Sequence, residues 1–408
     1  MKRVVRSSLR SLLDSRPGRV LRGWLQDSGP ARRSGIHSYG GAPDAEVVAY
    51  FGDGPDRLYQ LRQWVPALER LNENFRVVVV LRNERSFAAA KSLTDLPLVL
   101  AVSQPDLIDL YTAQDYRLAI YVNNSMRNFQ SMAEPAIIHV HVDHGESDKT
   151  SSISNQLKAY DKVFVAGPAA KERCERVLWG FDETKLVEIG RPPLDGEFVS
   201  VLPRDSRQTV VYAPTWEGEN DSNNFTSVDV LGLQIIESLL AANARVVYRP
   251  HPRTADLSES DFAAADRAIR AQIDEANESG GSHVISAEEN ILDLFVDADV
   301  LIADISSVGL DFLYLHPEKG LILTDRHNDP QRLEASSPIA SKLESLSLDT
   351  IAGLPRMLES VVTDESQSAA RRQLKEHYFG VASAGEATEL FVEAVENAVR
   401  ERESTRRS

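Results

Sequence analysis

The chain has 408 residues, of which 42% are hydrophobic, so it can form two or three domain cores and is not an intrinsically disordered protein. Its single cysteine, Cys174, excludes an internal disulfide framework and a cysteine-rich zinc module, and no apolar run reaches the roughly 18 residues that a membrane-spanning helix needs. These features fit a reducing cytoplasm best, and the net charge of −16 argues against general nucleic-acid binding.

Residues 1–36 form a basic leader in front of an acidic body. The leader holds nine lysines and arginines against two aspartates, a net charge of +7, which leaves −23 for the rest of the chain. Apolar residues recur between the arginines at roughly helical spacing, so a helix here could lay an apolar face on an anionic membrane surface. A second interpretation stays open, in which the leader is a basic tail or packs on its own domain.

Residues 37–195 alternate short apolar runs with amphipathic stretches, which is the pattern of a parallel α/β sheet. The strands expected in this half are 46–51, 76–81, 96–101, 117–122, 136–142, 161–166 and 185–190. Helices are expected over 57–72 and 153–160, among others. The pattern therefore predicts a first Rossmann-like domain.

Residues 196–384 repeat this alternation and predict a second Rossmann-like domain. The expected strands are a run that begins near 208, then 244–250, 283–287, 299–304 and 320–325. The boundary is expected in the polar, Pro- and Gly-rich segment 191–208, and residues 385–408 remain as a terminal segment with a charged tail. Two such halves place a ligand cleft where the carboxyl ends of their parallel sheets meet.

Polar residues follow three strands of the second half at their carboxyl ends. Ser306 and Ser307 stand at an expected helix start, where hydroxyls and free backbone N–H groups could hold a phosphate at the positive end of the helix dipole. Asp311, about one helical turn later, is expected near the same opening of the cleft. The strand-end candidates are Thr215 and Trp216 in YAPTW, Arg249 and His251 in RPHP, and Asp304, Ser306 and Ser307 in DISSVGLDF.

The string HVHVDHGESDK, residues 139–149, permits two interpretations. Its H-x-H-x-D-H pattern resembles the zinc-ligand motif of metallo-β-lactamase-type hydrolases, and strand alternation would put His139 and His141 on one face, with a turn at Asp143 before His144. The further ligands of that motif, however, have no counterpart at a matching position. We therefore prefer a structural interpretation, with His139 and His141 as half-buried strand residues and no bound metal.

Four motifs occur in order at plausible spacing: the HG of residues 144–145, YAPTW, RPHP and D-x-SSV-x-x-DF. Together they resemble the CDP-glycerol glycerophosphotransferase family, which builds teichoic-acid-type poly(alditol phosphate) polymers, over about residues 135–385. The resemblance implies a GT-B fold of two Rossmann-like domains facing across a cleft, with the terminal helix crossing back to the first. It also implies metal-independent transfer of glycerol phosphate from a CDP-linked donor, such as CDP-glycerol or CDP-ribitol, to a lipid-linked or glycan acceptor, without a cofactor, at the inner face of the cell membrane.

The same resemblance assigns roles to residues. It places the two catalytic histidines on His144 and His251, and the donor-phosphate contacts on Ser306 and Ser307. A neutral imidazole at His144 can take a proton from the acceptor hydroxyl, while cations and the helix start stabilise the phosphate charge. The other substrate-binding candidates are Gly145, Lys149, Thr215, Trp216, Arg249, Asp304 and Asp311.

One motif departs from the family pattern. Family members commonly show a W-H-G-T-P-like string, whereas this chain has D-H-G-E-S-D-K, in which Glu146, Asp148 and Lys149 could also form an ordinary solvated turn. The departure leaves the acceptor open. Three other functions also stay open: a UDP-sugar glycosyltransferase or epimerase-like enzyme on the same frame, a zinc-dependent hydrolase, and a catalytically silent protein that binds a membrane surface.

Overall fold

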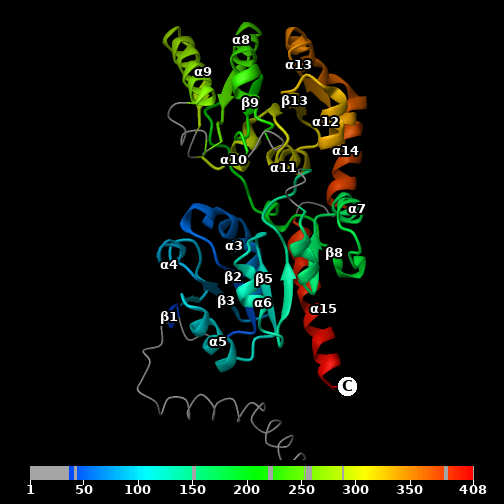
Figure 1. The fold of residues 1–408 in the computed structure, drawn as a ribbon. Helices are drawn as coiled ribbons and strands as arrows, with labels where there is room; N and C mark the ends of the chain where they lie inside the picture. The colour runs from blue at the N-terminus through cyan, green and yellow to red at the C-terminus, as the bar shows by residue number, and fades with distance from the viewer. Residues whose placement is uncertain are drawn as a thin grey trace, which may run out of the picture.

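A computed structural model describes residues 36–40, 44–148, 153–218, 224–251, 253, 260–286, 289–380 and 385–407. The predicted membrane contact through 1–36 therefore falls, except for residue 36, outside the described residues, and so does Lys149. Two α/β lobes are stacked on each other, and the last helix runs back along the first lobe (Figure 1). In the described part of the chain, no helix combines the length and apolarity needed to cross a membrane.

The first lobe is built on an eight-stranded sheet with the order β1-β4-β3-β2-β5-β6-β7-β8. All neighbouring strands are parallel except β1 and β4, which are antiparallel. The central strands are apolar throughout because helices cover both faces of the sheet. The strands are β1 Ile36–Tyr39, β2 Val47–Phe51, β3 Val77–Leu81, β4 Leu98–Ala101, β5 Leu118–Tyr121, β6 Ile138–His141, β7 Lys162–Val165 and β8 Leu186–Glu188.

The second lobe is built on a six-stranded parallel sheet with the order β11-β10-β9-β12-β13-β14. Strand β9 lies between β10 and β12, so the strand order reverses there and opens a crevice at the carboxyl ends. The strands are β9 Thr209–Ala213, β10 Arg245–Tyr248, β11 Val284–Ile285, β12 Val300–Ala303, β13 Gly320–Thr324 and β14 Glu344–Leu346.

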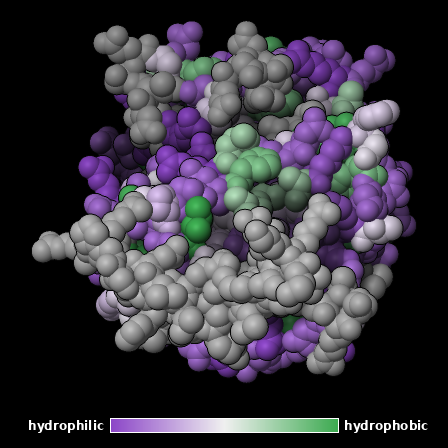
Figure 2. All heavy atoms as spheres, turned by 60° about the horizontal axis from the view of Figure 1, so that its bottom comes forward, coloured by the Kyte–Doolittle hydropathy of each residue, from purple (hydrophilic) through white to green (hydrophobic). Residues whose placement is uncertain are grey.

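Helices pack on both faces of each sheet. In the first lobe they are α3 Leu58–Asn72, α4 Glu84–Ala90, α5 Gln104–Ala113, α6 Asn128–Met132 and α7 Pro168–Val177. In the second lobe they are α8 Leu233–Ala241, α9 Asp261–Glu278, α10 Ile291–Asp297, α11 Ser307–Leu315, α12 Pro330–Ser336, α13 Leu354–Thr363 and α14 Glu365–Phe379. Seen from the end of the first lobe, the described surface is mostly hydrophilic, with a hydrophobic area near the centre of the view and smaller hydrophobic spots beside it (Figure 2).

The C-terminal helix α15, Ala387–Arg407, belongs to the core of the first lobe. Its Phe391 is fully buried, and its ring lies 5.3 Å from that of Trp64 in α3. Near the far end, Arg402 Nη2 donates a hydrogen bond to the carbonyl of Ala136, just before β6 (2.7 Å). The chain thus crosses from the second lobe, through α14 beside α7, back to the first lobe (Figure 1).

The fold class predicted from the sequence, α/β with two parallel sheets, is confirmed. All twelve expected strands are present within or at their predicted ranges. Residues 153–160 were expected to be a helix and contain only a short 3-10 helix, Asn155–Ala159. Strands β1 and β14 were not predicted, because both are short edge strands without an apolar run.

Gly167, before α7, lies where α14 of the second lobe reaches the first. An ideal Cβ at this position would be 2.7 Å from both Gly380 N and Tyr378 O, and backbone atoms cannot move aside as a side chain can. We expect Gly167→Ala to lower the free energy of unfolding by about 1–3 kcal/mol, measured by urea denaturation. Gly353→Ala is the matched control, because a Cβ there meets no atom within 4 Å. Equal stability of both variants would contradict this packing.

Candidate active site

A cavity of about 510 Å³ lies between the lobes. Its lining combines the predicted first-lobe motif with strand-end residues of the second lobe. Eight predicted site residues line it: His144, Gly145, Thr215, Trp216, Arg249, His251, Ser306 and Ser307. The residues Tyr59, Asn124 and Arg253 also line it and were not predicted. The catalytic and binding roles of all these residues stay predictions, but their convergence on one cleft is a property of the structure.

The second-lobe wall is formed by the carboxyl ends of β9, β10 and β12. Helix α11 begins in the cleft wall with Ser306 as its N-cap in an extended conformation (φ −162°, ψ 173°). The Ser306 side chain makes no capping hydrogen bond among the described residues; its hydroxyl instead donates to the carbonyl of Asp304 (3.3 Å). The first-turn N–H groups of α11 are therefore suited to an anion, as the serine motif predicts.

Asp304 does not lie in the cleft, although it was expected to bind substrate. Its carboxylate is fully buried and accepts hydrogen bonds from the backbone N–H of Thr215 (2.6 Å) and Ser227 (3.2 Å) and from the Thr324 hydroxyl. Burial raises the pKa of Asp304, and these hydrogen bonds oppose that shift. Asp304 therefore braces the YAPTW loop and so fixes the cleft wall that Thr215 forms.

His251 is held in one hydrogen-bonding state by its own loop. Its Nδ1 accepts a hydrogen bond from the backbone N–H of Arg253 (3.2 Å). A ring nitrogen that accepts carries no proton, so the neutral ring carries its proton on Nε2 and can donate there. The guanidinium of Arg253 lies 3.6 Å above the ring of Trp216, which in turn lies beside the His251 ring. One face of Trp216 is thus covered by a cation.

Arg249 brings a second cation to this wall. Its guanidinium donates to the carbonyl of Pro250 (2.8 Å), and its Nε is buried without a hydrogen-bond partner among the described residues. Burial lowers the pKa of Arg249. Together, Arg249, Arg253 and the start of α11 make the second-lobe side of the cleft the side that favours an anion.

His144 is in the opposite hydrogen-bonding state to His251. Its Nδ1 lies 2.9 Å from Asp143 Oδ1, and a carboxylate can only accept, so Nδ1 carries the proton and Nε2 keeps a lone pair. Burial alone would raise the pKa of Asp143, but the charge of His144 and its hydrogen bonds lower it to about 2. Asp143 is therefore ionised near neutral pH. The sequence indicated it only as a turn.

The backbone around His144 is held by two side chains. Trp64 Nε1 donates to the carbonyl of Asp143 (2.7 Å), and Arg191 Nη2 donates to the carbonyl of His144 (2.7 Å). Arg191 Nε also donates to Asp311 Oδ1 on α11 (3.4 Å). Asp311 was expected near the donor phosphates, but it is buried against Arg191 and does not line the cleft. Burial raises the pKa of Asp311, and the charge of Arg191 opposes this.

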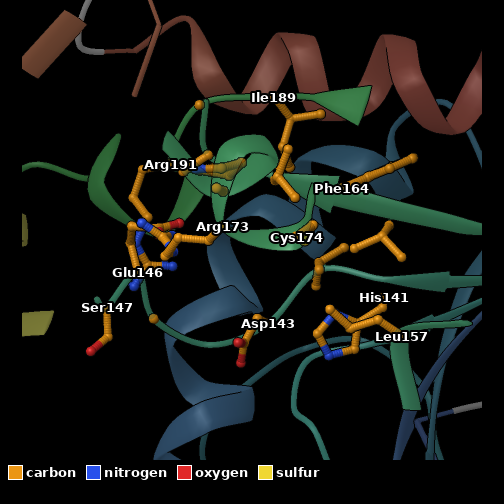
Figure 3. Close-up of a pocket in the computed structure, with 18 of the residues that line it drawn as sticks. His141, Asp143, Glu146, Ser147, Leu157, Phe164, Arg173, Cys174, Ile189 and Arg191 are labelled. Atoms are coloured by element: carbon orange, nitrogen blue, oxygen red, sulfur yellow. The ribbon is translucent and has the colours of Figure 1, made fainter. Parts of the chain in front are cut away.

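In the loop that follows β6 and contains His144 and Gly145 (the HG loop), Glu146 and Asp148 are buried, so they do not form a solvated turn. Both carboxylates pair with Arg173 of α7, at 3.1 Å for Asp148, and Figure 3 shows Glu146 beside Arg173. Asp148 also accepts hydrogen bonds from Ser337 Oγ (2.8 Å) and Tyr378 Oη (2.7 Å) of the second lobe. Burial raises the pKa of Asp148. This loop is therefore a contact between the lobes.

His139 and His141 are buried rather than half-buried, and burial lowers the pKa of both. Both ring nitrogens of His139 are hydrogen-bonded, Nδ1 to Tyr121 Oη (2.8 Å) and Nε2 to the carbonyl of Glu134 (2.9 Å). The His141 ring lines a cavity of about 60 Å³ beneath the HG loop (Figure 3). Within the described ranges, no three His, Cys, Asp or Glu side chains are placed to hold a metal ion.

Cys174 of α7 is buried, and burial raises the pKa of its thiol to about 11. A thiol of this kind is almost entirely protonated at neutral pH and is a poor nucleophile. The structure therefore agrees with a packing role for this residue.

Residues 136–319 match the family model described as CDP-glycerol:poly(glycerophosphate) glycerophosphotransferase. All four motifs lie within this segment. Over this segment, which is just under half of the chain, the match confirms the resemblance that the motifs show and agrees with the predicted enzyme class, a CDP-glycerol glycerophosphotransferase. No curated protein matches the chain.

Several solved structures share the fold. The wall teichoic acid polymerase TagF, in a variant soaked with CDPG, matches with a TM-score of 0.55 at 15% identity over 98% of both chains. A glycosyltransferase from Rickettsia africae matches with a TM-score of 0.52 at 12% identity, over 88% of this chain and 99% of that one. UDP-GlcNAc 2-epimerase from Methanocaldococcus jannaschii matches with a TM-score of 0.54 at 13% identity, over 86% of this chain and 99% of that one. These likenesses establish the GT-B fold that the motifs implied.

Removing Asp148 would leave Arg173 with Glu146 alone and would unpair the hydroxyls of Ser337 and Tyr378. We expect Asp148→Ala to lower the free energy of unfolding by about 3 kcal/mol, near the lower end of the range for removing one partner of a buried ion pair. Chemical denaturation measures the loss. As a control, Glu365→Ala removes an exposed partner of Arg372 and should cost less than about 1 kcal/mol. Equal losses in the two variants would show that the loop contact does not stabilise the fold.

Proposed function

We propose that this chain transfers glycerol phosphate, or a similar alditol phosphate, from a CDP-activated donor to a hydroxyl of a lipid-linked or polymeric glycan acceptor, with release of CMP. The family match over residues 136–319 supports the reaction class. The observation that carries the assignment of roles is the opposite hydrogen-bonding state of two histidines that line one cleft from opposite lobes. One histidine is prepared to accept a proton and the other to donate a hydrogen bond.

In the proposed step, His144 Nε2 takes the proton of the acceptor hydroxyl. The hydroxyl oxygen forms a bond to the β-phosphorus of the donor, the bond between this phosphorus and the bridging oxygen breaks, and CMP leaves with that oxygen. The proton then passes from His144 to solvent. Little covalent work falls to the protein, so positioning and charge stabilisation must supply most of the rate.

The diphosphate is proposed to lie on the second-lobe wall. His251 Nε2–H, Arg249 and the backbone N–H groups at the start of α11 are the proposed donors, with the hydroxyls of Ser306 and Ser307 beside them. Thr215 and Trp216 would border the same ligand, and Gly145 would let it approach the HG loop. No cofactor is required, because the donor supplies both the transferred group and the leaving group.

The opposite wall would receive the acceptor. Tyr59, Gln63 and Asn124 line the first-lobe side of the cleft, and the Tyr59 ring lies 6.1 Å from that of His144 in an edge-on arrangement. These amide and phenol groups are suited to hydrogen-bonding hydroxyls. An acceptor bound here would present its hydroxyl to His144.

The proposed enzyme works at the inner face of the cell membrane, where the basic leader 1–36 would contact anionic lipid. The support is its net charge of +7 in front of an acidic body. A chain that begins at residue 37 should lose sedimentation with vesicles rich in anionic lipid, while the full chain should sediment with them and be released by salt. Equal sedimentation of both chains would remove this part of the proposal.

His144→Gln and His251→Gln should each lower CMP release by at least about 10²-fold, because each removes a proton acceptor or a phosphate contact used in the transition state. The assay follows CMP release from CDP-glycerol and CDP-ribitol with a synthetic lipid-linked glycan as acceptor. His377→Gln is the matched control, because this exposed histidine lies on α14 and outside the cleft. It should keep the wild-type rate.

The melting temperature with each donor, together with the nucleotide that is released, distinguishes the alternative of a UDP-sugar enzyme. CDP-glycerol should raise the melting temperature of the protein, since a ligand that binds only the native state stabilises it, whereas UDP-N-acetylglucosamine should not. Release of UDP in place of CMP would favour the alternative. Wild-type turnover in both histidine variants would contradict the proposed site.

A further inference from the structure

The side chain of Asp143 turns back onto the next residue of its own chain. Its backbone lies in the left-handed region (φ 53°), which Asp tolerates better than most residues. As a result, Oδ1 accepts hydrogen bonds both from the backbone N–H of His144 (2.7 Å) and from its Nδ1–H (2.9 Å). The carboxylate thus determines which nitrogen of the His144 ring carries the proton.

Two side chains other than Asp143 also hold the backbone at this turn. Trp64 holds the carbonyl of Asp143, and Arg191 holds the carbonyl of His144. The His144 ring can still rotate and change tautomer, since its side chain is about one third exposed to the cleft. Among the described residues, the hydrogen bond to Asp143 is the only hydrogen bond that this ring makes.

We infer that Asp143 is the positioning residue of the proposed base: it fixes His144 as the Nδ1–H tautomer, with the Nε2 lone pair available to the acceptor hydroxyl. Without it, an exposed imidazole would exchange between two tautomers and two ring orientations, of which only one presents a lone pair in the right place. The carboxylate also stabilises the positive charge that the ring gains when it takes the proton. A carboxylate that orients a histidine in this way contributes up to about 10⁴ in rate in the Ser-His-Asp arrangement.

The inference also bears on the altered first motif. The family that the motifs resemble commonly has a tryptophan before the HG pair, and a tryptophan side chain could not accept a hydrogen bond from the Nδ1–H of the histidine. In this chain, Asp143 occupies that place and does accept one. The departure therefore supplies a partner for the histidine instead of weakening the site.

The test uses Asp143→Gly and Asp143→Asn, because both residues accept a positive φ and should leave the turn folded. The protein is labelled with ¹⁵N in the histidine rings, and the His144 signals are assigned as those lost in His144→Gln. At about pH 8, above the ordinary titration range of histidine, the wild type should show a protonated Nδ1 and a bare Nε2. Asp143→Gly should show a mixture of tautomers.

Kinetics give the second readout. The kinetic consequence rests on the proposed function, whereas the tautomer does not. Both variants should lower kcat by about 10-fold to 10⁴-fold with little change in KM, because the carboxylate contacts His144 and acts through it. Asp182→Asn, an exposed carboxylate that also accepts an N–H in its own turn, is the matched control and should keep both the tautomer and kcat.

The two readouts separate the possible failures. A wild-type tautomer in both Asp143 variants would overturn the inference. The tautomer could change in the Asp143 variants while even the wild type releases no CMP from any donor. That result would uphold the positioning role of Asp143 and overturn the proposed reaction. A changed tautomer with unchanged kcat would overturn the role of Asp143 in catalysis.

Discussion

The arrangement of the candidate site depends on the Arg191 guanidinium, which ties together three parts of the chain. Arg191 follows β8, donates to the carbonyl of His144 in the first lobe and pairs with Asp311 on α11 of the second. A buried ion pair loses its hydration, and the loss is offset only where the remaining donors find acceptors; here the His144 carbonyl is such an acceptor. The position of His144 therefore depends on the approach of the lobes, because the side chain that holds it also holds α11.

Parallel topology explains why the strand-end motifs meet. Consecutive parallel strands bring their carboxyl ends to one edge of a sheet, so YAPTW, RPHP and DISSVGLDF had to lie together once β9, β10 and β12 were neighbours. Apolar runs were enough to predict those strands. Arg191 gave the same strand-end signal directly after the run 185–190, and Arg253 stood beside RPHP, so both could have been included among the candidates from sequence alone.

Other features could not be predicted, because they depend on tertiary geometry. Asp148 lies 189 positions before Ser337 and 230 before Tyr378, and only the packing of the lobes brings these partners together. The burial of Asp304 and Asp311 also depends on tertiary geometry. Each carboxylate has a buried partner, which the spacing of residues in the sequence does not reveal. Strand alternation predicted one face for His139 and His141, but not that tyrosines would enclose them.

The two cleft histidines show how neighbours give one side chain two chemical states. A carboxylate beside His144 requires a proton on Nδ1, and a backbone N–H beside His251 excludes one. The sequence motifs specify an imidazole at each position, but the atom next to Nδ1 decides whether Nε2 accepts or donates. A change in the residue before the HG pair can therefore preserve the proposed chemistry when it supplies an acceptor, as Asp143 does, and the first motif can vary in composition while the state of its histidine remains defined.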